Sequence, residues 1–143
     1  MNGLDNMEVI EAAVSERDGM VSFRIGPSHT KNSIADGVVG ENIISVVSVR
    51  LDTFVASRRA PTLLLVDVEG TEIQVLESGL ETISRYLPII MVEVHWLGAT
   101  FIDFFERELQ PLGYIASTYD GKPLRSDPVR YHAVLVPKRL PWV

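Results

Sequence analysis

Four side chains that could carry out chemistry follow two predicted strands. Asp67 and Glu69 come directly after an apolar run that ends at Val66, and Glu93 and His95 follow a second apolar run. Alternation along a strand places Asp67 and Glu69 on one side of the first strand, and Glu93 and His95 on one side of the second. Because ligands bind outside the carboxyl ends of strands in open parallel sheets, these two motifs predict a site at that edge.

This carboxylate–His group, defined as Asp67, Glu69, Glu93 and His95, permits several kinds of chemistry. Crowded carboxylates repel one another unless a cation lies between them, so the group could bind a metal ion or an ammonium- or sulfonium-bearing ligand. One carboxylate could instead be a general base, and His95 could take a proton from a hydroxyl or ligate a metal. Purely structural roles are the alternative: Glu69 and Glu72 beside a helix start would each contribute about 0.3–1 kcal/mol.

A strand–helix–strand unit must position these side chains. Leu63–Val66 and Ile89–Val92 are continuous apolar runs, which is typical of parallel strands that are covered on both faces. Between them, helically spaced apolar residues predict a helix that starts at a capping box, Thr71–Gln74, and ends before Pro88. Gly79 interrupts this helix and indicates a kink or an early end. So short a connection predicts a right-handed parallel crossover.

The flanking segments are predicted to complete a single α/β domain over residues 1–143. A hairpin-like turn is expected at Arg17–Gly19, and Asp52 is expected to cap a short helix over Thr53–Ser57. A longer helix is predicted to start at Thr100 and to end at Gly113. The further predicted strands are Glu8–Val14, Met20–Ile25, Ile43–Arg50, Tyr114–Tyr119 and Arg130–Val136, the last antiparallel to its predecessor.

The composition argues against several classes of protein. The 143 residues are 46% hydrophobic, enough for one domain with a core, and the formal net charge of −6 disfavours nucleic acid or an anionic membrane surface as a partner. There are no cysteines, which excludes disulfides, thiolate metal sites and cysteine nucleophiles. No apolar run approaches the roughly 18 residues of a membrane span, and the N-terminus does not resemble a signal peptide. We therefore expect a soluble cytoplasmic protein.

Several motifs resemble the FkbM-type family of S-adenosylmethionine-dependent O-methyltransferases, and they occur in the family's order over nearly the whole chain. The block Asp67-Val68-Glu69-Gly70, combined with the downstream Glu93-Val94-His95, is the most specific part of the resemblance. The other matching segments are Asn2–Asn6 leading into Ala12–Ser15, Leu51-Asp52, Leu65–Val66, Thr71-Glu72, Val75–Gly79 and Pro88–Val92.

The resemblance implies a fold and a set of site residues. The fold would be the Rossmann-like sheet of class I methyltransferases, mostly parallel with an antiparallel last strand, and the cofactor would be S-adenosylmethionine. Asp67 would lie near the cofactor and the acceptor hydroxyl, Ala12 and Ala13 would approach the adenine, and Glu93 and His95 would line the acceptor side. Further candidates for substrate binding are Trp96, after the second strand, and Asn32 and Ser33, in the polar segment Gly26–Asn42.

One part of the family pattern has no counterpart here. Such enzymes carry a glycine-rich cofactor loop after the first strand, and none of the ten glycines forms a Gly-x-Gly. The sequence therefore looks like the C-terminal part of such a domain, truncated at its N-terminus. The Leu63–Val66 strand would then have an unpaired apolar edge. We expect the Glu8–Val14 strand, the Ile43–Arg50 strand or a second copy in a homodimer to cover that edge.

The function favoured by this resemblance is transfer of a methyl group from S-adenosylmethionine to a hydroxyl of a sugar or other small metabolite. No metal ligand is assigned, although a metal at the carboxylate–His group is compatible with the residue types. One alternative is a phosphoesterase-like enzyme that uses Mg²⁺ or Mn²⁺ at this group. The other is a non-catalytic module that dimerises.

Overall fold

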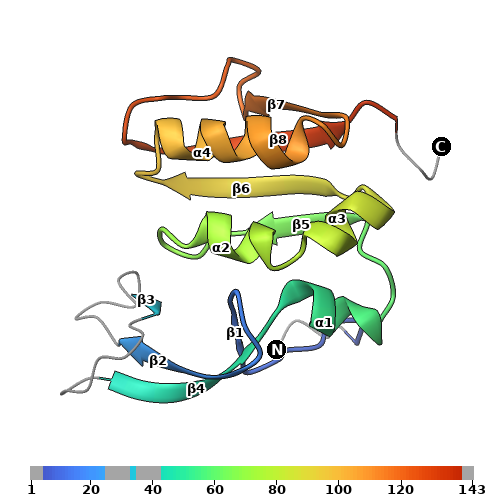
Figure 1. The fold of residues 1–143 in the computed structure, drawn as a ribbon, viewed down its shortest axis with the longest axis vertical. Coiled ribbons are helices and arrows are strands. Elements are labelled where there is room, and N and C mark those ends of the chain that lie inside the picture. Colours follow the sequence, from blue (N-terminus) through green and yellow to red (C-terminus); the bar gives the residue numbers. More distant parts are fainter. Residues whose placement is uncertain (1–4, 25–32, 35–42, 140–143) are drawn as a thin grey trace.

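The computed structural model describes residues 5–24, 33–34 and 43–139, and its strands form two sheets (Figure 1). The N-terminal sheet has the strand order β1-β4-β2-β3, and the C-terminal sheet has the order β5-β6-β8-β7. Asp67 follows β5, and Glu93 and His95 lie at the end of β6. The C-terminal sheet therefore positions the candidate site.

The C-terminal sheet consists of β5 (Leu63–Val66), β6 (Ile89–His95), β7 (Tyr114–Thr118) and β8 (Arg130–Pro137). β5 and β6 are parallel, and β8 lies between β6 and β7 and runs antiparallel to both. This arrangement confirms the predicted parallel pair and the antiparallel last strand. The apolar residues of β6 alternate between the two faces, so every second residue from Ile90 onward is buried.

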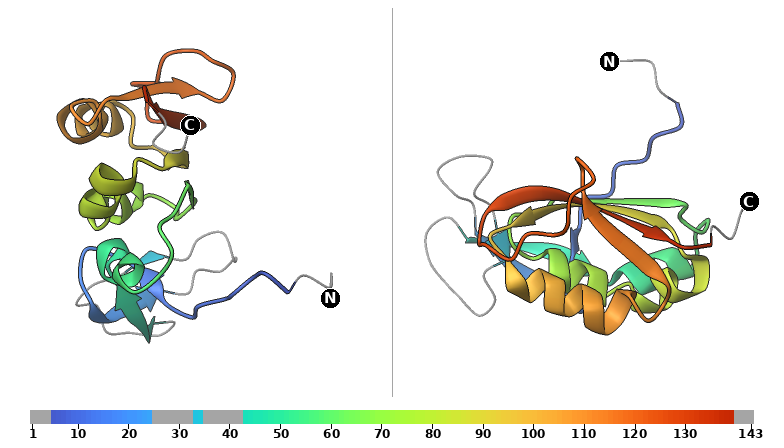
Figure 2. Two further views of the ribbon diagram at one scale, coloured as in Figure 1. Left: turned by 90° about the vertical axis from the view of Figure 1, so that its right-hand side faces the viewer. Right: turned by 90° about the horizontal axis from the view of Figure 1, so that it is seen from above.

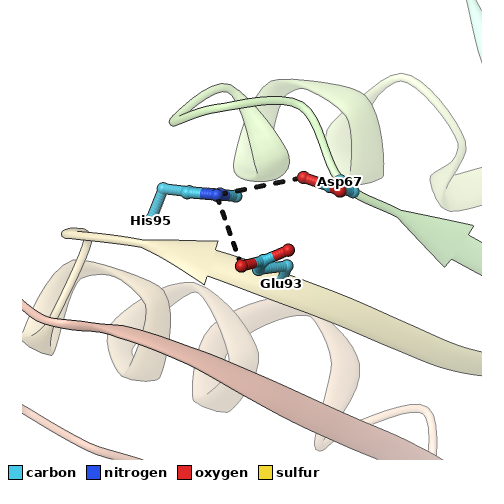
Figure 3. A group of neighbouring side chains, drawn as sticks. All are labelled: Asp67, Glu93 and His95. Atoms are coloured by element: carbon cyan, nitrogen blue, oxygen red, sulfur yellow. Dashed lines mark ion pairs between the residues drawn. The ribbon is translucent and has the colours of Figure 1, made fainter. Parts of the chain in front are cut away.

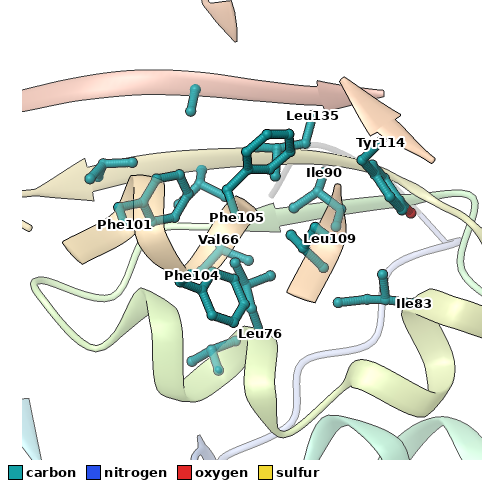
Figure 4. Close-up of a cluster of buried hydrophobic side chains, with 14 of the residues drawn as sticks. Val66, Leu76, Ile83, Ile90, Phe101, Phe104, Phe105, Leu109, Tyr114 and Leu135 are labelled. Atoms are coloured by element: carbon teal, nitrogen blue, oxygen red, sulfur yellow. The ribbon is translucent and has the colours of Figure 1, made fainter. Parts of the chain in front are cut away.

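Four helices cover one face of this sheet (Figure 2). They are α2 (Glu72–Glu77), α3 (Leu80–Tyr86), α4 (Ala99–Phe104) and the short π-helix η1 (Phe105–Leu109), whereas α1 (Leu51–Ala56) packs beside α3. Their apolar side chains pack against the covered face of the strands to form one core (Figure 4). Leu76, Phe101 and Leu109 are fully buried there, and each such side chain stabilises the fold by about 1.5–3 kcal/mol.

The opposite face of the sheet is open at β5. Leu63 and Leu65 are 51% and 74% exposed. The expectation that both parallel strands are covered on two faces is therefore wrong for β5. An apolar run does not distinguish a strand covered on two faces from one whose outer face is bare, because both lack polar residues.

Two of the three partners expected for the edge of β5, the Glu8–Val14 strand and the Ile43–Arg50 strand, are wrong. Among the described residues β5 pairs with β6 alone, because β1 and β4 pair with each other and β4 pairs in turn with β2. Within the N-terminal sheet β4 pairs with β2 from Ile43 to Ser48 and with β1 at Ser48 and Val49, so neither β1 nor β4 reaches β5. Pairing of the β5 edge with a second copy stays a prediction.

The N-terminal sheet consists of β1 (Ala13–Val14), β2 (Gly19–Arg24), β3 (Ser33–Ile34) and β4 (Ile43–Val49). Its β2–β3 and β2–β4 pairs are antiparallel and only β1–β4 is parallel, so the predicted, mostly parallel sheet is matched only in part. The Glu8–Val14 strand is reduced to its last two residues, since the preceding residues have no partner strand. The hairpin at Arg17–Gly19 is wrong, because β1 and β2 lie on opposite sides of β4.

Gly79 divides the predicted central helix into α2 and α3. A side chain at this position would have its Cβ 2.5 Å from Cδ2 of Leu51, so only glycine permits the close approach of α1. The predicted capping box is absent: the Thr71 hydroxyl donates to the Val68 carbonyl at 3.2 Å and does not cap α2. The C-terminal helix starts at Ala99, one residue before the predicted cap Thr100.

Asp52 does cap a helix, but not the predicted one. It lies in the first turn of α1, and its carboxylate accepts hydrogen bonds from the backbone N–H groups of Thr82 at 2.8 Å and Glu81 at 3.3 Å. These groups belong to the first turn of α3, which has no side-chain cap at its own N-cap residue, Gly79. Asp52 therefore joins α1 to α3.

We expect Asp52→Ala to lower the free energy of unfolding by about 1 kcal/mol, within the range of about 0.5–2 kcal/mol for loss of a helix cap. Urea unfolding followed by circular dichroism measures this change. Asp52→Asn, which keeps one acceptor oxygen, should lose less, and Asp103→Ala on the exposed side of α4 serves as the control. Equal stability of Asp52→Ala and the native protein would contradict the cap.

Candidate functional site

His95 ends β6 and lies at the centre of the carboxylate–His group. Its side chain is only 1% exposed, and its Nδ1 lies 2.7 Å from Oε1 of Glu72, which is fully buried. A buried carboxylate at this distance accepts a hydrogen bond from the Nδ1–H group. Glu72 therefore fixes the ring orientation and leaves Nε2 as the nitrogen that faces the site.

The turn after β5 holds Glu72 in place. The backbone N–H of Gly70 donates to the same Oε1 of Glu72 at 2.8 Å. Glu69 and Gly70 both have positive φ angles, 53° and 101°, and this conformation turns the chain sharply between β5 and α2. Gly70 adopts its positive φ without steric cost because it has no Cβ.

Three carboxylates face the buried nitrogen of His95. Nε2 lies 3.9 Å from Oδ1 of Asp67, 3.7 Å from Oε2 of Glu69 and 3.8 Å from Oε1 of Glu93 (Figure 3 draws Asp67, Glu93 and His95). These distances are too long for hydrogen bonds, and Nε2 has no hydrogen-bond partner. The structure thus brings together all four side chains that the sequence predicted at this edge.

The register of the sheet explains why these residues meet. Val66 of β5 is paired with Val92 of β6, so the residues that follow them, Asp67 and Glu93, leave adjacent strand ends. His95 comes two residues later on the same side of its strand. The sheet edge therefore gathers side chains that are about 25 positions apart in the chain.

Sequence reasoning missed three residues of the site. Glu72 was interpreted only as a helix-terminus charge, although its spacing from Val75 and Leu76, both buried, places it on the inner face of α2. Arg130 and His132 contact Glu93, with Nε of Arg130 3.2 Å from Oε1 and Nε2 of His132 3.7 Å from Oε2. They come from β8, and no signal in the sequence reveals its register against β6.

Other predicted site residues lie outside the carboxylate–His group. Trp96 is 59% exposed with φ 55°, and its ring centroid lies 5.6 Å from that of His95, so it forms an open rim of the site. Ala12 and Ala13 lie in the N-terminal region and line a cavity of about 450 Å³ together with Glu11 and residues 44–47 of β4. No member of the carboxylate–His group lines this cavity. Asn32 lies outside the described residues, and of Ser33 only the backbone in β3 is described.

The cavity beside Ala12 and Ala13 and the carboxylate–His group would bind different kinds of ligand. The cavity beside Ala12 and Ala13 is within the range of volumes of ligand pockets, about 300–1,000 Å³. The ligand atoms of Asp67, Glu93 and His95 lie within 4.8 Å of one another, close enough to surround a single ion. The two places differ in chemistry, since one is mostly apolar and the other is rich in carboxylate oxygens.

Comparison with known proteins identifies the family of the chain. The model of the FkbM methyltransferase domain matches residues 2–116, and the chain belongs to this family. Membership of this family does not favour the phosphoesterase alternative. No curated protein gives a significant match.

One solved structure is similar in part. It is the crystal structure of the methyltransferase FkbM from Methylobacillus flagellatus KT, which is 19% identical, with a TM-score of 0.47. The match covers 64% of this chain and 23% of that one, so the matched part is about a quarter of the larger protein. Within the described residues, no helix is both long and apolar enough to cross a membrane.

Proposed function

We propose that the protein transfers a methyl group from S-adenosylmethionine to a hydroxyl of a sugar or other small metabolite at the carboxylate–His group. Membership of the FkbM family supports methyl transfer. The observation that carries the assignment to this site is the buried, unpartnered Nε2 of His95, which faces three carboxylates at the ends of β5 and β6.

The residues of the chain suit the cofactor in two respects. The cavity beside Ala12 and Ala13 has the size and the small, apolar side chains that an adenine ring requires, with the carboxylate of Glu11 at its rim for polar contact. The negative charge of Asp67 and Glu69 suits a positively charged sulfonium. When bound, S-adenosylmethionine supplies an electrophilic methyl group.

The side chains of the site would bind the acceptor and take up its proton. Asp67 is the most exposed of the three carboxylates, at 58%, so it can reach an acceptor hydroxyl that enters from solvent. Its carboxylate or Nε2 of His95 would accept the hydroxyl proton, and such proton transfer contributes about 10²–10⁴-fold to a rate. The Glu72–His95 hydrogen bond would keep the imidazole in place, and Trp96 would contact the acceptor at the rim.

The partners that we propose are the small-molecule acceptor and a second copy of the chain. Among the described residues no strand pairs with the outer edge of β5, and the exposed Leu65 lies on the open face beside that edge, which favours pairing between identical edges. Light scattering after size exclusion tests this idea: Leu65→Lys should give monomers if native dimers form through β5. A native protein that is monomeric at high concentration would contradict the pairing.

The proposed reaction is tested with S-adenosylmethionine that carries a labelled methyl group and a panel of sugars and hydroxylated metabolites. We expect label in an acceptor as a methyl ether, with S-adenosylhomocysteine formed in equal amount. Label found on a nitrogen or a carboxyl group would contradict O-methylation. Release of phosphate from phosphate esters without any use of the cofactor would contradict methyl transfer altogether.

A further inference from the structure

The carboxylate–His group contains acceptor atoms only. With Nδ1–H of His95 bound to Glu72, Nε2 presents a lone pair to the site, and the atoms that face it belong to the carboxylates of Asp67, Glu69 and Glu93. Nothing in this arrangement donates to Nε2, which is buried and has no hydrogen-bond partner. The three carboxylates lie 3.7–3.9 Å from Nε2, and electron-rich groups gathered in this way repel one another unless a positive centre lies among them.

A hydrogen on Nε2 would find no hydrogen-bond acceptor in the observed geometry. An Nε2–H group would need an acceptor within about 3.2 Å to form a good hydrogen bond, and the nearest carboxylate oxygen is 3.7 Å away. The separation instead leaves room in the middle of the group for an atom that contacts several of its members at once.

Only one of the three carboxylates that face Nε2 has an arginine beside it among the described residues. Arg130 and His132 both contact Glu93. Among the residues that the structure describes, neither Asp67 nor Glu69 forms an ion pair with a lysine or an arginine. A cation at the centre of the group would neutralise the two carboxylates that the protein itself leaves unpaired.

We propose that Asp67, Glu93 and His95 bind one divalent transition-metal ion, of the Mn²⁺ or Zn²⁺ class. Their ligand atoms lie within 4.8 Å of one another, and ligand atoms about 2.0–2.2 Å from an ion are about 3–3.6 Å apart, so the side chains need to close by about 1 Å. One imidazole nitrogen with carboxylate oxygens suits these ions better than Mg²⁺ or Ca²⁺, which prefer oxygen alone.

The contacts of Glu72 match those of a group that positions a metal ligand. A histidine that binds a metal through one nitrogen commonly donates its other N–H to a carboxylate, which orients the ring. Glu72 accepts from Nδ1 at 2.7 Å and is itself held by the N–H of Gly70 at 2.8 Å. Glu72 is thus a positioning residue for the ion.

Titration of the full chain with Mn²⁺, followed by electron paramagnetic resonance, tests this proposal without cofactor or acceptor. We expect one bound ion per chain and coupling of the ion to a single imidazole nitrogen. Asp67→Asn and Glu93→Gln should each weaken binding by more than about tenfold, because even groups outside the ligand shell change metal affinity by about 10–100-fold. The charge-matched controls Asp103→Asn and Glu106→Gln, on the exposed side of α4 and η1, should bind as the native protein does.

Three results would overturn the proposal: no saturable binding of Mn²⁺ or Zn²⁺, a bound ion without nitrogen coupling, or unchanged affinity in both Asp67→Asn and Glu93→Gln. The nitrogen coupling is measured on the native protein and does not depend on the folding of any variant. Because neither S-adenosylmethionine nor an acceptor is present, failure of metal binding leaves the methyl-transfer proposal standing, and failure of methyl transfer leaves the metal site standing.

Discussion

Replacing His95 with alanine is expected to lower the free energy of unfolding by about 3 kcal/mol, because leaving a buried polar group without its hydrogen-bond partner costs about 1–3 kcal/mol, and more when that group is charged. Glu72 is fully buried, and its Oε1 is bonded to His95 and to the N–H of Gly70, while its Oε2 has no partner. Without the imidazole this carboxylate would keep a single hydrogen bond in an apolar surrounding. The substitution should also abolish methyl transfer, since Nε2 lies at the centre of the site.

Urea unfolding of His95→Ala, Glu72→Ala and the double variant measures this effect. Because the two side chains act as a pair, the loss in the double variant should be clearly smaller than the sum of the two single losses. His132→Ala provides a histidine control on the exposed side of β8, where a change within about 0.5 kcal/mol is expected. A loss below about 1 kcal/mol in His95→Ala would show that the buried pair contributes little.

Asp67→Asn is expected to reduce the rate of methyl transfer by about 10²–10⁴-fold with little change in stability. The amide keeps the shape of the side chain but removes both the negative charge and the ability to accept a proton. Asp67 is more than half exposed and forms no hydrogen bond with another described residue, so its replacement should leave the fold intact.

The rate is measured as formation of S-adenosylhomocysteine at saturating cofactor and acceptor, so that weakened binding does not obscure the chemical step. Asp103→Asn removes the same charge from the exposed side of α4 and should keep the native rate. A decrease of less than tenfold in Asp67→Asn would exclude this carboxylate from the proton transfer.

The candidate site could be predicted from the sequence because it depends on strand ends. A continuous apolar run fixes where a strand ends, alternation fixes which residues share a side, and parallel neighbours bring their carboxyl ends to one edge. Asp67 and Glu93 could thus be placed together, although the sequence predicted one interrupted helix between their strands where the structure has two, α2 and α3. The break at Gly79 was predicted as a kink or an early helix end and is confirmed, whereas the close approach of Leu51 to Gly79 is a long-range contact that no local pattern encodes.

The features that could not be predicted depend on how strands distant in the sequence pair with one another. The contacts of Arg130 and His132 with Glu93 follow from the antiparallel pairing of β8 with β6, in which Glu93 is opposite His132 and His95 is opposite Arg130. No local pattern encodes that register. The prediction of a strand over the whole of Glu8–Val14 was wrong for a related reason. Apolar and β-branched residues favour a strand only where a neighbouring strand supplies hydrogen bonds.

Calorimetric titration of the chain with S-adenosylmethionine tests the central claim most directly, because it needs no knowledge of the acceptor. We predict one molecule bound per chain, with weaker binding in Asp67→Asn and unchanged binding in Asp103→Asn. Absence of saturable binding, or binding that Asp67→Asn does not alter, would contradict the proposal that the carboxylate–His group is the methyl-transfer site of this chain.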